Sequence, residues 1–134
     1  MVLKRISCTF CKILNDELPS HKVWENEGFL AFLDINPINP GHTLVIPKKH
    51  SDYIFDLQDK TYTEIFNVIK KIAEPLRKAM NSKRIGVAIE GFAVPHVHIH
   101  LVPLNKENEL DPHRAIKANE EDLVKIAQKI REMF

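Results

Sequence analysis

Residues 96–102 read His96-Val97-His98-Ile99-His100-Leu101-Val102, so that three histidines alternate with apolar side chains. Successive side chains of a β-strand point to opposite faces of the sheet. The pattern therefore predicts a strand over residues 94–104 that presents the three histidines on one face and buries the apolar residues between them on the other. A solvent-facing strand explains one histidine easily, but it does not explain three in strict alternation.

The segments around this strand predict an α+β fold. Residues 23–25, 29–33, 43–46 and 85–89 are short β-branched or aromatic runs separated by turn formers. Consecutive strands joined by tight turns favour an antiparallel sheet with helices packed on it over a doubly wound parallel fold.

Two helices are expected. Residues 59–82 carry apolar side chains three or four positions apart, which predicts one long helix. Asp59 is the expected N-cap, with a capping box of Thr61 and Glu64 as the second choice. Pro75 should kink or split this helix. After a polar linker at 105–119, residues 120–134 predict a C-terminal helix.

The bulk composition limits the class of partner. The 134 residues suit one domain, and 44% hydrophobic with 28% charged residues is ordinary for a soluble protein. A formal net charge of +1 argues against a general attraction to nucleic acid or to a membrane surface. The N-terminus does not resemble a signal peptide, and no apolar run is long enough to span a bilayer. We therefore expect a cytoplasmic protein.

The two cysteines, Cys8 and Cys11, form a Cys-x2-Cys pair. Such a pair is typical of a redox motif or of half a zinc site, and no βαβ pattern surrounds it to favour the redox motif. His50 is a good third zinc ligand because it follows a rigid strand. His96 or His100 would be the fourth.

The histidine stretch resembles the His-φ-His-φ-His-φ-φ signature (φ is apolar) of the histidine triad (HIT) superfamily. Residues 34–37, Asp-Ile-Asn-Pro, and 40–50, Pro-Gly-His-Thr-Leu-Val-Ile-Pro-Lys-Lys-His, resemble its upstream signature. The resemblance runs from about Cys8 to Pro103. It implies a single HIT domain over 1–134, with a core of about 8–104 and a C-terminal extension at 105–134. It also implies a homodimer whose antiparallel sheet continues across a two-fold axis.

The resemblance implies attack on the α-phosphate of a nucleoside phosphoramidate or dinucleoside polyphosphate, with an adenosine or guanosine moiety. His98 would be the nucleophile and would form a nucleotidyl-histidine intermediate, which suits a neutral imidazole near pH 7. His100 and His42 would contact the phosphate, or His100 would protonate the leaving group. Three alternatives remain open: transfer of the nucleotide to a phosphate acceptor, nucleotide binding without turnover, and a zinc-binding structural module.

The resemblance also assigns binding residues. Asp34 matches the acidic residue that bonds the ribose hydroxyls. Phe10, Leu30 and Phe32 lie near the positions of the apolar base pocket, although ordinary core positions explain these three equally well.

For the metal, bacterial HIT hydrolases and the related galactose-1-phosphate uridylyltransferases pair Cys-x2-Cys with a downstream histidine and with the first histidine of the strand. That analogy implies a closed, structural Zn²⁺ site built from Cys8, Cys11, His50 and His96.

The loop before the histidines departs from the family pattern. Residues 90–95, Glu-Gly-Phe-Ala-Val-Pro, are short and contain no Gln, Ser or Thr to donate to a phosphate. Ile89 stands where the family has an asparagine. Fewer side chains are therefore expected to contact phosphate and ribose, or main-chain N–H groups take their place.

Overall fold

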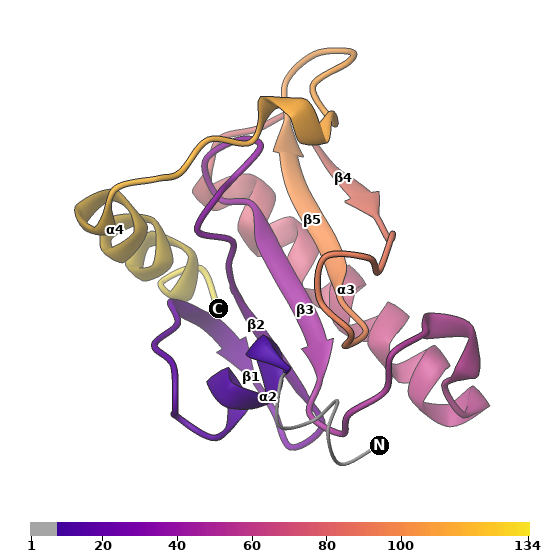
Figure 1. The fold of residues 1–134 in the computed structure, drawn as a ribbon. Helices are drawn as coiled ribbons and strands as arrows, with labels where there is room; N and C mark the ends of the chain where they lie inside the picture. Colours follow the sequence, from indigo (N-terminus) through magenta and orange to yellow (C-terminus); the bar gives the residue numbers. More distant parts are fainter. Residues whose placement is uncertain (1–7) are drawn as a thin grey trace.

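A computed structural model describes residues 8–134 of the chain. Its strands form one antiparallel sheet in the order β1-β2-β3-β5-β4 (Figure 1). The strands are β1 (Lys22–Glu25), β2 (Phe29–Leu33), β3 (Thr43–Pro47), β4 (Arg84–Ala88) and β5 (Ile99–Leu104). The expected α+β fold with an antiparallel sheet is confirmed.

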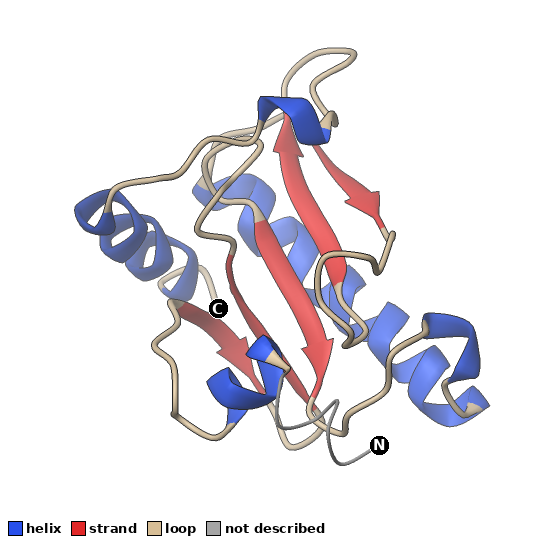
Figure 2. Ribbon diagram, in the orientation of Figure 1, coloured by secondary structure: helices blue, strands red, loops and turns tan. Residues whose placement is uncertain are grey.

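The helices divide between the two faces of this sheet (Figure 2). The long helix α3 (Asp59–Ala79) lies across one face, and α4 (Glu120–Arg131) packs on the same face beside β1. The short helix α2 (Thr9–Leu14) covers the opposite face. Two 3₁₀ turns complete the elements, η1 (Ile54–Asp56) and η2 (Pro112–Arg114).

Alternation along the central strands separates two apolar clusters. In β2, Ala31 and Leu33 pack toward α3 and α4, while Leu30 and Phe32 pack toward α2. All five residues of β2 are buried. The sheet is therefore a rigid layer with apolar contacts on both faces, which suits it to hold side chains in fixed positions.

The histidine strand begins later than expected, at Ile99 instead of residue 94. The reason lies in the main chain, because the N–H of His96 donates to the carbonyl of Val94 and the N–H of Val97 donates to that of Ser51. The predicted alternation nevertheless holds. Val97, Ile99 and Leu101 are all buried in the cluster under α3.

The helix boundaries also differ from the expected ones. Helix α3 ends at Ala79, three residues early, and its N-cap is Gln58, which makes no side-chain cap bond; Asp59 is the first helical residue instead. The helix continues through Pro75, so the expected split is wrong. The carbonyl that loses its donor there belongs to Lys71, an exposed residue, so that water can take the place of the missing N–H. Helix α4 ends at Arg131.

The segment expected as a polar linker is fixed to the rest of the fold. The N–H groups of Ile116 and Ala118 donate to the carbonyls of Pro37 and Ile35, at 3.3 and 3.0 Å. Arg114 donates to the Asn39 side chain at 3.0 Å. This segment therefore lies against the loop between β2 and β3. None of the described helices is long and apolar enough to cross a membrane.

Gly41 immediately precedes His42 and has φ +90°, a conformation that favours glycine. A Cβ there would lie 2.6 Å from Met80 Cγ and 3.1 Å from Pro103 Cγ. We expect Gly41→Ala to lower the free energy of unfolding by about 2–4 kcal/mol, through backbone strain and overpacking together. Urea denaturation measures this change. Gly28→Ala is the matched control, since a Cβ at Gly28 would meet no atom within 4 Å; equal losses in both variants would contradict the argument.

Candidate active site and metal centre

His98 is held in one tautomer by a main-chain contact. Its Nδ1 lies 2.8 Å from the carbonyl oxygen of His96. Because a carbonyl only accepts, Nδ1 carries the proton and Nε2 keeps its lone pair. The ring is buried at 3% exposure and packs edge-on against Phe10, with the ring centroids 5.2 Å apart. No sequence signal could have identified this acceptor, because any residue supplies a carbonyl.

His42 and His100 form a second chain of hydrogen bonds. The N–H of Ile38 donates to Nδ1 of His42 at 3.0 Å, so the neutral His42 ring carries its proton on Nε2. That Nε2 lies 2.9 Å from Nδ1 of His100 and donates to it. The neutral His100 ring then carries its own proton on Nε2. The hydrogen bond from the Ile38 N–H to His42 therefore determines, through His42, that Nε2 is the protonated nitrogen of His100.

Burial keeps both of these rings neutral. It lowers the pKa of His100 to about 4, with His42 and His98 lowering it further. Burial also lowers the pKa of His42, partly opposed by the Asp34 carboxylate, whose oxygen lies 3.7 Å from His42 Nε2. The neutral forms required by the hydrogen-bond chain are therefore the forms present near pH 7.

A pH dependence of stability follows. The pKa of His100 falls from 6.5 when unfolded to about 4 when folded, so only the unfolded chain takes up this proton between those values. The contribution of His100 to the free energy of unfolding should therefore fall as pH drops from 6.5 to 4, and level off below. We expect His100→Gln to make this fall less steep, by at most about 1.4 kcal/mol per pH unit. Urea melts across this range measure it. His113→Gln, at an exposed site, should keep the wild-type slope; an unchanged slope in His100→Gln would contradict the prediction.

The three histidines His42, His98 and His100 line one cavity of about 470 Å³. Asp34, also in its lining, comes from the end of β2, and its Oδ1 accepts the N–H of Asn36 at 2.8 Å. The structure therefore brings together four of the residues assigned from sequence to catalysis or nucleotide binding. The remaining lining residues are Asn36, Ile38, Ala88, Glu90, Gly91, Phe92, Ala93, Leu110, Pro112 and Ala115.

The apolar residues assigned to a base pocket lie elsewhere. Phe10, Leu30 and Phe32 are buried in the cluster between α2 and the sheet, and none of them lines this cavity. Phe10 contacts the site through its edge-on packing against His98.

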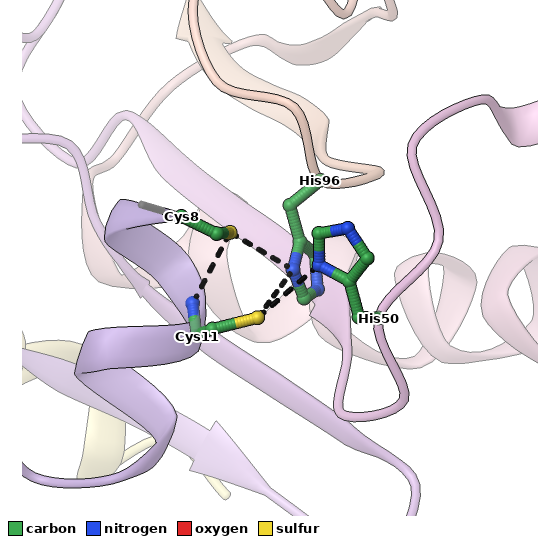
Figure 3. Close-up of side chains that lie close together, drawn as sticks. All are labelled: Cys8, Cys11, His50 and His96. Atoms are coloured by element: carbon green, nitrogen blue, oxygen red, sulfur yellow. Dashed lines mark hydrogen bonds between the residues drawn. The ribbon is translucent and has the colours of Figure 1, made fainter. Parts of the chain in front are cut away.

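Four other side chains converge at the end of α2 (Figure 3). Cys8 is the N-cap of this helix, and Cys11 lies within it. His50 follows β3, and His96 precedes β5. Nδ1 of His96 lies 3.4 Å from Cys8 Sγ and 3.5 Å from Cys11 Sγ, and Nδ1 of His50 lies 3.2 Å from Cys11 Sγ. The four donor atoms are all within 4.8 Å of one another.

This cluster has the chemistry and spacing of a tetrahedral zinc site. Zinc bonds of about 2.3 Å to sulfur and 2.0–2.1 Å to nitrogen place S and N ligands about 3.5 Å apart. His96 also has the tautomer that a metal needs, because its Nε2 lies 2.8 Å from the carbonyl of Pro47 and donates to it. Burial lowers the pKa of His96 to about 4, so Nδ1 is unprotonated. The sequence left His96 and His100 open as the fourth ligand. The cluster contains His96, whereas His100 is hydrogen-bonded to His42.

The sequence model of the HIT domain matches residues 15–107, more than half of the chain. The chain belongs to the HIT family. An uncharacterized HIT-like protein of Borreliella burgdorferi is 43% identical, over 84% of this chain and 86% of its own. The adenosine 5′-monophosphoramidase of Schizosaccharomyces pombe is 38% identical, over 78% of this chain and 77% of its own. The crystal structure of a Zn-bound histidine triad family protein from Mycobacterium smegmatis superposes with a TM-score of 0.83 at 30% identity, covering 96% and 94% of the two chains.

Part of the cavity wall of this HIT protein was missed by sequence reasoning. Leu110, Pro112 and Ala115 belong to the segment expected to be a polar linker, and they lie beyond the match to the family. Their apolar character, unusual within a charged stretch, was the available signal. Phe92 was noted only as part of the loop at residues 90–95, which contains no Gln, Ser or Thr side chain.

Proposed function

We propose that this protein is a nucleotide hydrolase that acts on a nucleoside 5′-phosphoramidate through a nucleotidyl intermediate on His98. The observation that carries the proposal is the fixed tautomer of His98, whose Nδ1–H donates to the His96 carbonyl and leaves the Nε2 lone pair for attack. A neutral imidazole held in this way attacks phosphorus without a separate base.

The first step joins His98 Nε2 to the α-phosphorus and breaks the bond from phosphorus to the amine nitrogen. The electron pair of that bond goes to the amine nitrogen, which takes the proton from Nε2 of His100; the negative charge left on that ring is balanced by the positive charge that the His98 ring gains. Nδ1 of the His100 ring accepts a hydrogen bond from His42, so the Nε2 of His100 carries the proton before the step. In the second step water attacks phosphorus, returns a proton to His100 and releases His98 with its electron pair. The products are the amine and a nucleoside monophosphate.

Asp34 is proposed to bond the ribose hydroxyls, since it lies in the same cavity as the three histidines and its Oδ2 faces His42. Phe10 and Phe32 are proposed to support the base side from within the apolar cluster, where Phe10 packs edge-on against His98.

We also propose that the cluster of Cys8, Cys11, His50 and His96 binds a structural Zn²⁺. When bound, the ion fastens α2 to the loops after β3 and before β5. Its four ligands are all supplied by the protein, which leaves no open coordination position for a substrate. Its role is therefore to hold the site together and not to take part in the phosphoryl chemistry.

A homodimer is proposed on the outer side of β4. Among the described strands, β4 and β1 lie at the two edges of the sheet, and Val87 of β4 is 46% exposed. A second copy pairing with β4 would continue the sheet. Light scattering should give twice the mass of the chain; the mass of a single chain would contradict it. The division into a domain core at 8–104 and an extension at 105–134 is likewise proposed, supported by the family match that stops at residue 107.

The function is tested by mixing the protein with adenosine 5′-phosphoramidate. We expect release of AMP and, in rapidly quenched samples, an intact mass raised by one adenylyl group. Tight binding without turnover would favour the nucleotide-binding alternative. Turnover that requires added phosphate would favour the transferase alternative, and neither binding nor turnover would favour a structural zinc module.

A further inference from the structure

Two cavities meet at His98. Besides the one that contains Asp34, a second cavity of about 460 Å³ is lined by Val97 and His98 together with residues of two loops. The two cavities share Glu90, Gly91, Phe92 and His98. A molecule whose phosphorus lies at His98 can therefore extend into both.

The second cavity has an aromatic and apolar rim. Tyr53, which precedes η1, and Phe55, which lies in it, are 55% and 68% exposed, and their ring centroids lie 5.4 Å apart in an edge contact. Phe92, between the two cavities, is 90% exposed. Ile89 adds a further apolar side chain to the lining. Exposed aromatic side chains gathered around a cavity are typical of a surface that covers an apolar ligand group.

The charge of the lining restricts what this group can be. Among the described residues that line either cavity, none is Lys or Arg, whereas Asp34, Asp52 and Glu90 are acidic. A polyphosphate leaving group carries several negative charges and is normally bound by Arg or Lys side chains or by a metal. An amine leaving group is neutral or positive, so it suits this lining.

We propose that the second cavity is a leaving-group subsite that selects phosphoramidates of amines bearing an aromatic or bulky apolar substituent. This inference rests on the proposed function and specifies its substrate class. The nucleoside monophosphate part occupies the cavity with Asp34 and the three histidines, and the amine substituent lies between Phe92 and the pair Tyr53 and Phe55. Phe92 and Phe55 are therefore specificity-determining residues.

The test compares kcat/KM for three substrates: adenosine 5′-phosphoramidate, the same compound with a 2-phenylethyl group on the amide nitrogen, and diadenosine tetraphosphate. We expect the phenylethyl compound to exceed the unsubstituted one by about tenfold, the range that an apolar pocket supplies. Diadenosine tetraphosphate should be the poorest of the three. Phe55→Ala and Phe92→Ala should each bring the ratio of the first two close to one. Phe134→Ala, which changes an exposed aromatic residue that lines neither cavity, should keep it.

Equal kcat/KM for the two phosphoramidates in the wild type, or a preference for diadenosine tetraphosphate, overturns the subsite while leaving the hydrolase function intact. Absence of any turnover overturns the proposed function itself. The oligomeric mass of each variant is measured in parallel. If the ratio of kcat/KM for the two phosphoramidates changes only in variants whose oligomeric mass also changes, the aromatic rim belongs to an interface between subunits. That result would overturn its role in specificity.

Discussion

His98→Ala is expected to lower kcat/KM for adenosine 5′-phosphoramidate by on the order of 10⁵-fold, since loss of a nucleophile removes the whole covalent route. The adenylyl adduct should disappear from the intact-mass spectrum. The fold should be retained, because the strand is anchored on its other face by Val97, Ile99 and Leu101. Nucleotide binding should remain measurable, since Asp34 and His42 are unchanged.

The matched control is His113→Ala, at a histidine whose exposed side chain pairs with Asp111 and lies outside the cavity at His98. It should keep wild-type turnover and the adduct. An adduct that persists in His98→Ala would assign the nucleophile to another residue, with His100 the first to examine. A melting curve for each variant separates loss of chemistry from loss of structure.

Cys8→Ser is expected to remove bound zinc and to destabilise the protein strongly. Cys8 is fully buried and its Sγ lies 3.4 Å from His96 Nδ1, so a hydroxyl there is a poor ligand in an apolar surrounding. Structural zinc contributes about 10–16 kcal/mol of apparent binding energy in zinc-finger peptides. Here the sheet has an apolar core of its own, so we expect a partial loss of at least about 3 kcal/mol, or roughly 10 °C in Tm.

Metal analysis of protein purified with Zn²⁺ measures the loss of zinc, and thermal unfolding measures the loss of stability. Zinc content should fall from one ion per chain to less than one tenth. His50→Ala should behave like Cys8→Ser, and His113→Ala should resemble the wild type. Unchanged zinc content in Cys8→Ser would show that the metal binds elsewhere.

The alternation of side chains was enough to predict that the three histidines of residues 96–100 point away from the core in which Ile99 and Leu101 are buried. That inference needs only the two-residue period of a strand, and burial of Ile99 and Leu101 confirms it. The start of the strand could not be predicted in the same way, because it depends on a hydrogen bond from Val97 to the distant Ser51. Likewise, a helix of six residues such as α2 is too short for a periodic pattern to show.

The zinc ligands were predictable as residue types, but the choice of His96 over His100 required the fold. The deciding contacts join His96 to Cys8 and Pro47, far apart in the chain. The tautomers were beyond the sequence altogether. They depend on main-chain groups at Ile38, Pro47 and His96, and these groups carry no residue signature.

The acceptor of the His98 Nδ1 proton is a neutral carbonyl rather than a carboxylate. A carboxylate in that place would push electron density into the ring and strengthen its bond to phosphorus. With a neutral acceptor, the phosphorylated imidazole of the proposed reaction would keep its positive charge and depart readily when water attacks. The contact that leaves Nε2 free to take up the nucleotide would then also shorten the lifetime of the proposed covalent intermediate.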